Sequence, residues 1–81
     1  MTDEIRSIVE EHARLPQGID ELSDESDLFQ AGMTSHASLS VMLALEDEFG
    51  IEFPDRMLKR NVFGSIASIR SALTELGVPV A

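Results

Sequence analysis

The longest helical pattern of the chain lies in residues 35–49, and it restricts the possible folds more than any other feature. Four apolar residues recur in it at spacings of three and four: Val41, Met42, Leu45 and Phe49. This spacing places them on one face of a helix, which must be buried against other elements. Gly50 follows at once and is a typical helix-terminating residue. We therefore predict an amphipathic helix over 35–49.

Two further segments have the same periodicity. In residues 3–14 the recurring positions are Ile5, Ile8, Val9 and His12. In the last predicted helix they are Ile66, Ile69, Leu73 and Leu76. Pro16 ends the first of these helices, whereas Ser65 caps the last one and Gly77 and Pro79 end it. Both segments are therefore predicted to be amphipathic helices with one buried face.

A shorter helix is predicted from Asp55 to about Arg60, with Asp55 as its cap. No segment has the two-residue alternation of a strand. The chain has 81 residues and no cysteine, so its stability must come from elements packed around one small core. We predict a single all-α domain over residues 1–81. It is a small four-helix bundle with a long loop, 15–34, between the first and second helices and a short third helix.

The long loop, LPQGIDELSDESDLFQAGMT, combines apolar and acidic residues. Its apolar residues can attach it to the core: Ile19, Leu22, Leu28 and Phe29. Five acidic residues raise the question of calcium: Asp20, Glu21, Asp24, Glu25 and Asp27. Their spacing does not fit the alternating ligands, central glycine and final glutamate of an EF-hand loop. We expect a solvated acidic loop and no metal site.

The net charge of the chain is −9. Nucleic acids and anionic membranes would repel it, so we expect neither as a partner and favour basic protein surfaces. A helix-turn-helix DNA-binding domain has only the basic cluster of Arg56, Lys59 and Arg60 in its favour. The acidic N-terminal segment lacks the features of a signal peptide, and no apolar run reaches membrane-spanning length. We therefore expect a cytoplasmic protein, with a monomer as the default state.

The helix over 35–49 begins with a serine, Ser35, whose purpose needs explanation. A nucleophilic serine requires a base within reach, but the side chain of His36 projects roughly 100° away around the helix. His12 lies on another predicted helix, and neither a G-x-S-x-G nor an S-x-x-K motif is present. We therefore predict no catalytic residue and no enzyme. Thr34 or Ser35 can cap the helix, and a helix N-terminus also favours an attached anion.

A second face of the same helix carries residues suited to a surface. Its members also recur at helical spacing: His36, Ser40, Leu43 and Asp47. If Val41 and Leu45 face the core, Leu43 must lie near the surface. It then shares a face with the first turn of the helix, where Ser35 lies.

Taken together, these segments resemble the acyl carrier protein family, whose four-helix domain binds phosphopantetheine. That family typically reads D-L-G-x-D-S-L, an apolar helix with an E-E-E-F-like end, I-P-D, and a last helix after F/I-x-S/T-V/I. The chain reads FQAGMTSH from residue 29, then VMLALEDEFG, IEFPD, and FGSI from residue 63. No single segment is specific, but their order and spacing are, and the resemblance is densest over residues 28–69. It implies a bundle of the acyl carrier protein type.

The resemblance implies a carrier that catalyses nothing itself. Ser35 would receive a 4′-phosphopantetheine arm from a separate phosphopantetheinyl transferase that uses coenzyme A. The thiol of the arm would hold a cargo as a thioester, loaded by an acyl- or amino acid-activating ligase and passed to a downstream transferase. The recognition face of the family, carried to matching positions, comprises Met33, Thr34, His36, Ser40, Leu43 and Asp47.

Two departures from the family pattern bear on the cargo. The D-S-L motif is Thr34-Ser35-His36 here, and the basic residues Arg56, Lys59 and Arg60 stand where fatty-acid carriers tend to be acidic. Both argue against a housekeeping fatty-acid carrier and suggest a specialised carrier with its own loading enzyme. The Thr34-Ser35-His36 variation favours an aminoacyl carrier protein, loaded by a ligase resembling class II aminoacyl-tRNA synthetases. Specialised acyl carriers of polyketide, nonribosomal peptide or lipid pathways remain open. The alternative function is a four-helix protein-interaction module that is never modified.

Overall fold

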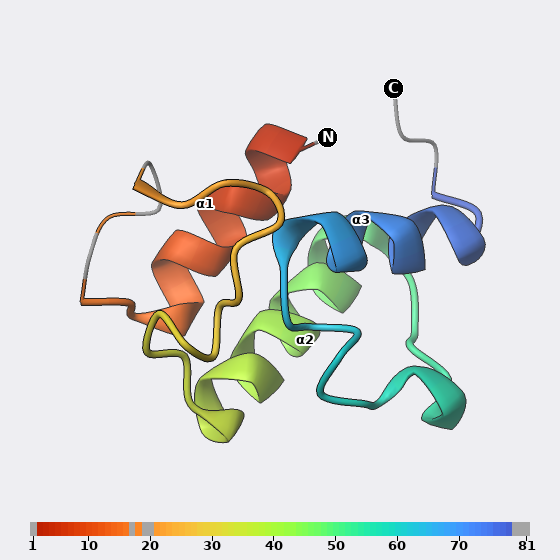
Figure 1. Ribbon diagram of the computed structural model, residues 1–81. Helices are drawn as coiled ribbons and strands as arrows, with labels where there is room; N and C mark the ends of the chain where they lie inside the picture. The colour runs from red at the N-terminus through yellow and green to blue at the C-terminus, as the bar shows by residue number, and fades with distance from the viewer. Residues whose placement is uncertain (1, 17, 19–20, 79–81) are drawn as a thin grey trace.

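The computed structural model describes residues 2–16, 18 and 21–78. These residues form three α-helices, α1 (Thr2–Ala13), α2 (Ser35–Phe49) and α3 (Ile66–Glu75), and a one-turn 3₁₀ helix, η2 (Asp55–Met57) (Figure 1). They contain no strand, so the predicted all-helical class is confirmed. The bounds of α2 are those predicted from its periodicity. No helix of the described chain is long and apolar enough to cross a membrane.

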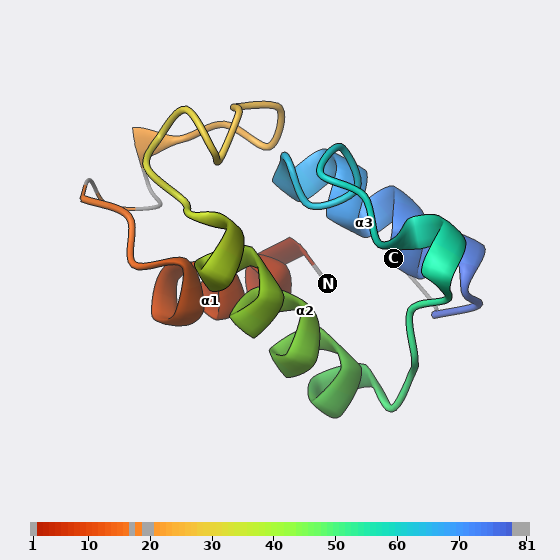
Figure 2. The same cartoon turned by 90° about the horizontal axis from the view of Figure 1, so that it is seen from below.

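The core lies between the three α-helices. Helix α1 packs against both α2 and α3, and the long loop that follows α1 passes over one side of the molecule (Figures 1 and 2). The side chains with no exposed surface come from all three helices and the loop: Ile5, Val9, Leu28, Val41, Leu45, Ile66, Ile69 and Leu73. The predicted core stripes of α1 and α3 are thus largely confirmed. In α2 the stripe is narrower, because Met42 and Phe49 are only partly buried.

Specific bonds attach the long loop to the helices. The Arg6 guanidinium donates to the Asp24 carboxylate at 2.6 Å and to the Leu22 carbonyl at 3.0 Å. The Ala67 N–H, in the first turn of α3, donates to the Asp24 carbonyl at 2.8 Å. The predicted anchor Leu28 is fully buried, whereas Leu22 and Phe29 are partly buried. Asp24 is therefore a structural residue rather than part of a purely solvated acidic loop.

Two of the loop residues considered above, Ile19 and Asp20, lie outside the described residues. Among those that are described, no group of three or more carboxylates or histidines is arranged to hold a metal ion.

The short helix predicted from Asp55 to Arg60 is wrong beyond Met57. Only Asp55–Met57 form a helical turn, because the backbone of Leu58 (ψ 63°) leaves helical geometry. The predicted cap is also wrong: the N-cap position is Pro54, which provides no side-chain bond. Since the helix stops early, residues 58–65 form an irregular connection to α3.

Candidate functional site

The start of α2 shows which of two neighbouring hydroxyls caps the helix. Thr34 is the N-cap residue, with an extended backbone (φ −86°, ψ 166°), and the Ala37 N–H donates to its hydroxyl oxygen at 3.0 Å. Ser35 is the first residue inside the helix. A capping side chain satisfies one of the N–H groups that the first turn leaves without a helical partner. The sequence left two candidates for the N-cap, Thr34 and Ser35. The structure shows that Thr34 caps the helix.

The hydroxyl of Ser35 consequently does not cap the helix. The residue is exposed, and its hydroxyl forms no hydrogen bond with any other described residue. Its backbone carbonyl accepts a bond from the Ser38 hydroxyl at 2.7 Å. Neither histidine is bonded to it; the nearest charged partner of His12 is Glu11, at 3.8 Å. The site presents an available hydroxyl without a local base, which suits modification by another protein rather than catalysis.

A tight turn before α2 determines where this hydroxyl lies. The Met33 N–H donates to the Leu28 carbonyl at 3.0 Å. Gly32 has φ +121°, and a Cβ atom there would come within 2.8 Å of the Pro16 ring. Only glycine combines this backbone conformation with so close an approach. The close approach of Gly32 to Pro16 therefore fixes the turn that leads into Thr34 and Ser35.

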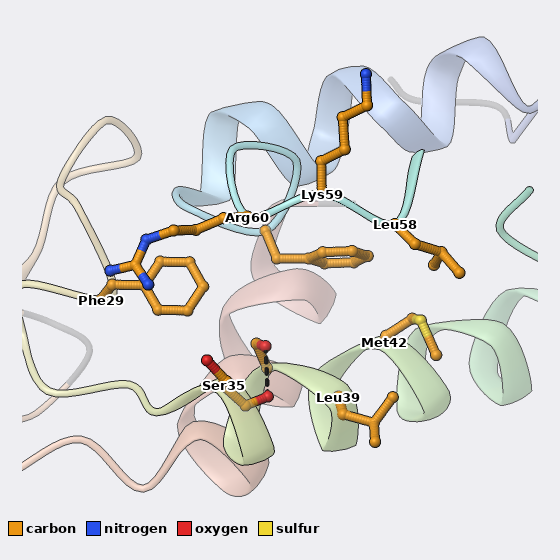
Figure 3. Close-up of a pocket in the computed structure, with 9 residues that line it drawn as sticks. Phe29, Ser35, Leu39, Met42, Leu58, Lys59 and Arg60 are labelled. Atoms are coloured by element: carbon orange, nitrogen blue, oxygen red, sulfur yellow. Dashed lines mark hydrogen bonds between the residues drawn. The ribbon is translucent and has the colours of Figure 1, made fainter. Parts of the chain in front are cut away.

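A cavity of about 350 Å³ opens beside Ser35, between α2 and the connection that follows η2 (Figure 3). It is lined by Phe29, Ser35, Ser38, Leu39, Met42, Leu58, Lys59, Arg60 and Phe63. The Arg60 guanidinium carbon lies 4.0 Å from the centre of the Phe29 ring, a cation–π contact at the same end of the cavity as Ser35. This cavity was not predicted from the sequence. Its only local signal was that Leu39 and Met42 follow Ser35 at helical spacing.

The residues predicted to form a partner face differ in their exposure to solvent. Thr34, His36 and Asp47 are exposed, and Leu43 is 54% exposed. Ser40 is partly buried. Met33 is 3% exposed and belongs to the core, so its assignment to the surface is corrected. The reason is the tight turn, which directs Met33 inward while the next residue caps the helix.

Two exposed leucines extend the apolar surface beyond the predicted face. Leu39 and Leu58 are each 48% exposed and lie on opposite walls of the cavity. Neither residue was predicted to lie on a binding surface. Leu58 was expected inside a helix, and Leu39 lies between the two stripes of α2. Exposed large apolar side chains that gather at one place are typical of binding surfaces.

Comparison with known proteins gives the family context. Residues 3–71 match the family described as "Phosphopantetheine attachment site". The chain is 42% identical over 73 residues to the aminoacyl carrier protein of Agrobacterium fabrum, and the match covers 90% of this chain and 88% of that protein. It is also 40% identical over 74 residues to the non-reducing polyketide synthase CTB1 of Cercospora nicotianae, where the match covers 91% of this chain and 3% of the synthase.

Solved structures agree with these sequence matches. The fold is similar to the Agrobacterium tumefaciens carrier protein in a crystal structure with an engineered Bradyrhizobium japonicum glycine:[carrier protein] ligase and AMP. The TM-score is 0.89 at 42% identity, over 91% of this chain and 99% of that one. A solution structure of an Agrobacterium tumefaciens protein matches with a TM-score of 0.73 at 41% identity, over 93% of this chain and 90% of that one.

Proposed function

The chain belongs to the phosphopantetheine attachment-site family, and from that premise we propose that it holds an amino acid as a thioester on a 4′-phosphopantetheine arm attached to Ser35. Members of this family are carriers and not catalysts. The observation that supports Ser35 most directly is its position: the hydroxyl is exposed at the first residue of α2 and is released from capping by Thr34.

The surroundings of Ser35 fit such a group. Attachment forms a bond between the Ser35 hydroxyl oxygen and the coenzyme A phosphorus that carries pantetheine, and 3′,5′-ADP leaves as the pyrophosphate bond breaks. The hydroxyl proton passes to the transferase, since no described residue at this site is placed to take it. The resulting phosphodiester lies at a helix N-terminus, where the dipole and the N–H groups favour negative charge. The bound arm supplies a thiol, which a chain without cysteine lacks.

The proposed cargo is an amino acid. Two similar proteins support this choice, the aminoacyl carrier protein of Agrobacterium fabrum and the carrier solved with a glycine:[carrier protein] ligase. The partners would be a phosphopantetheinyl transferase, an amino acid-activating ligase and a downstream transferase. The ligase would contact the exposed residues of the predicted face, chiefly His36, Leu43 and Asp47. A specialised acyl group is the alternative cargo.

The proposal also covers the domain organisation, the oligomeric state and the location of the protein. We take residues 1–81 as one carrier domain that acts as a monomer in the cytoplasm. In the four-helix arrangement implied by the sequence, η2 takes the place of the short helix, since it lies between α2 and α3 and buries Met57.

The test is the intact mass of the protein after incubation with coenzyme A and a broad-specificity phosphopantetheinyl transferase. The wild type is expected to gain one phosphopantetheinyl unit, and Ser35→Ala none. Ser38→Ala is the matched control, because Ser38 lines the same cavity, and it should be modified like the wild type. Modification of Ser35→Ala would refute the site. No gain in the wild type, nor in protein purified from its own cells, would favour the unmodified interaction module.

A second measurement addresses the cargo. The modified protein would be incubated with ATP, an amino acid-activating ligase and one amino acid at a time, beginning with glycine. A mass gain of one aminoacyl group that hydroxylamine removes would establish an aminoacyl thioester. Loading by fatty acids or other acyl groups alone would refute the amino acid cargo and leave the attachment at Ser35 intact.

A further inference from the structure

The residue that follows helix α1 has a backbone conformation that its side chain does not favour. Arg14 comes directly after Ala13, the last residue of α1, and has φ +53°. It is the one non-glycine residue of the described chain with a positive φ. The left-handed region suits glycine at the end of a helix, because a Cβ atom crowds the backbone there. Residues that retain such strain gather at functional sites, so the side chain of Arg14 calls for a function.

The guanidinium group of Arg14 has no partner that explains its position. The residue is exposed, and within the described residues its side chain forms no hydrogen bond or ion pair. Glu10 and Glu11 stand four and three residues earlier, the spacing at which ion pairs form on a helix. No such pair forms, since the left-handed backbone takes Arg14 out of the helix. The N–H donors of the guanidinium therefore remain available to another molecule.

Arg14 lies at the end of the molecule where α2 begins. Two residues further on, the ring of Pro16 packs so closely on Gly32 that a Cβ atom there would come within 2.8 Å of it. Gly32 precedes Ser35 by three residues. The end of α1 and the start of α2 also lie at the same end of the molecule in both views (Figures 1 and 2). Arg14 is therefore a cation near the proposed attachment site, on an element outside the predicted partner face.

The exposed charges along α2 are divided by sign. The first turn of α2 contains no acidic residue, in a chain of net charge −9. Arg60 lies at the Ser35 end of the cavity (Figure 3). The exposed acids Asp47 and Glu48 lie in the last turn of the same helix. A partner that docks over Ser35 thus meets cations near the start of α2 and carboxylates at its end.

We propose that Arg14 is a docking contact for the amino acid-activating ligase and that its guanidinium pairs with a carboxylate of that enzyme. This inference rests on the proposed carrier function and adds a residue of another element to the partner face. A guanidinium with free donors binds a carboxylate through two parallel hydrogen bonds, which fix orientation as well as position. A ligase that docked the other way round would bring like charges together, which is unfavourable.

The ligase suits this contact better than the transferase does. In the transferase, the phosphates of coenzyme A must lie at the Ser35 hydroxyl, so the surface of that enzyme around them has to be positively charged. A positively charged surface would repel Arg14. The ligase reacts with the far end of the arm, so its surface beside Ser35 is free to carry acidic residues.

The first test measures loading of the phosphopantetheine-modified protein by the ligase, with ATP and glycine. Arg14→Gln should raise KM for the carrier and lower kcat/KM roughly tenfold, with kcat unchanged, because a charged docking contact is lost. Arg14→Gly should show the same loss, although its free energy of unfolding should equal or exceed that of the wild type, since glycine accepts a positive φ. A residue that served only the fold would not combine retained stability with impaired loading. Arg56→Gln removes the same charge outside the cavity and should load like the wild type.

Cross-linking tests the chemistry of the contact independently. Arg14→Lys places an amine at this position, and a carbodiimide couples an amine to a nearby carboxylate: an amide bond forms, and the carbodiimide takes up the water and becomes a urea. Digestion and mass spectrometry of the complex should give a peptide that joins position 14 to an Asp or Glu of the ligase. Lys59, whose ammonium group points away from Ser35 (Figure 3), is an internal control for unspecific coupling. The contact is overturned if position 14 is not coupled to the ligase while loading proceeds.

Failure of the inference and failure of the proposed function are distinguishable in the same samples. Intact mass records the arm before loading and the aminoacyl group after it. A wild type that gains neither arm nor amino acid overturns both proposals. Loading of Arg14→Gln with the kcat/KM of the wild type overturns the contact alone. Slower attachment of the arm to Arg14→Gln, with unchanged loading, would assign Arg14 to the transferase and overturn its contact with the ligase.

Discussion

The hydroxyl of Thr34 accepts the Ala37 N–H at 3.0 Å, and this bond leaves the neighbouring hydroxyl of Ser35 unengaged. In the sequence, Thr34 and Ser35 were equally good candidates for the helix cap. In the structure they have different roles. Thr34 stabilises the start of α2, and Ser35 is available to another protein. The division has a direct consequence for stability.

Thr34→Ala should destabilise the protein by about 1 kcal/mol, since it removes an N-cap. Ser35→Ala should change the free energy of unfolding by no more than about 0.5 kcal/mol, because it removes an exposed hydroxyl without a partner. Urea unfolding monitored by circular dichroism measures both values. Thr34→Ser retains a capping hydroxyl and serves as the control. A larger loss for Ser35→Ala than for Thr34→Ala would mean that Ser35 caps the helix.

Gly32→Ala should destabilise the turn that precedes α2 by about 1–3 kcal/mol, because φ +121° is unfavourable for alanine and the new Cβ would meet Pro16 at 2.8 Å. Since this turn positions Ser35, the rate of phosphopantetheinylation should fall as well. Gly18→Ala is the matched control, with no atom within 4 Å of the new Cβ. Equal stability and equal modification rates for the two variants would contradict this account.

Arg6→Met should cost about 1–3 kcal/mol, since it removes charge-assisted hydrogen bonds to Asp24 and Leu22 that attach the long loop to α1. The comparison is Arg56→Met, which breaks an exposed ion pair with Glu75 and should cost less than about 1 kcal/mol. Thermal unfolding of the two variants ranks them directly. The expected order would be disproved by a smaller loss for Arg6→Met.

Leu43→Ala should leave the free energy of unfolding within about 0.5 kcal/mol of wild type, because the side chain is 54% exposed. It should reduce kcat/KM for loading by the ligase roughly tenfold, equivalent to about 1.4 kcal/mol of lost contact. Leu45→Ala, two residues away and fully buried, should instead destabilise the fold by about 2–5 kcal/mol. Unchanged loading of Leu43→Ala would remove Leu43 from the proposed face.

Much of this molecule could be predicted from local sequence. The bounds of α2, the capping of α3 by Ser65 and the buried faces of α1 and α3 all agree with prediction. These features depend on residues within one or two turns of each other, because helical periodicity and capping bonds are local. The serine was found in the same way, from its place at the start of a predictable helix.

Other features depend on segments that are distant in the chain. The burial of Met33, the end of η2 at Met57 and the packing of Arg60 on Phe29 were not predicted. Residues 29 and 60 meet only after the helices have packed, and no periodicity links them. By itself the sequence determined the three α-helices, the Ser65 cap of α3 and the candidate serine, since these follow from local bonding. Only the tertiary structure decided which side chains surround that serine, because packing brings distant segments to one place.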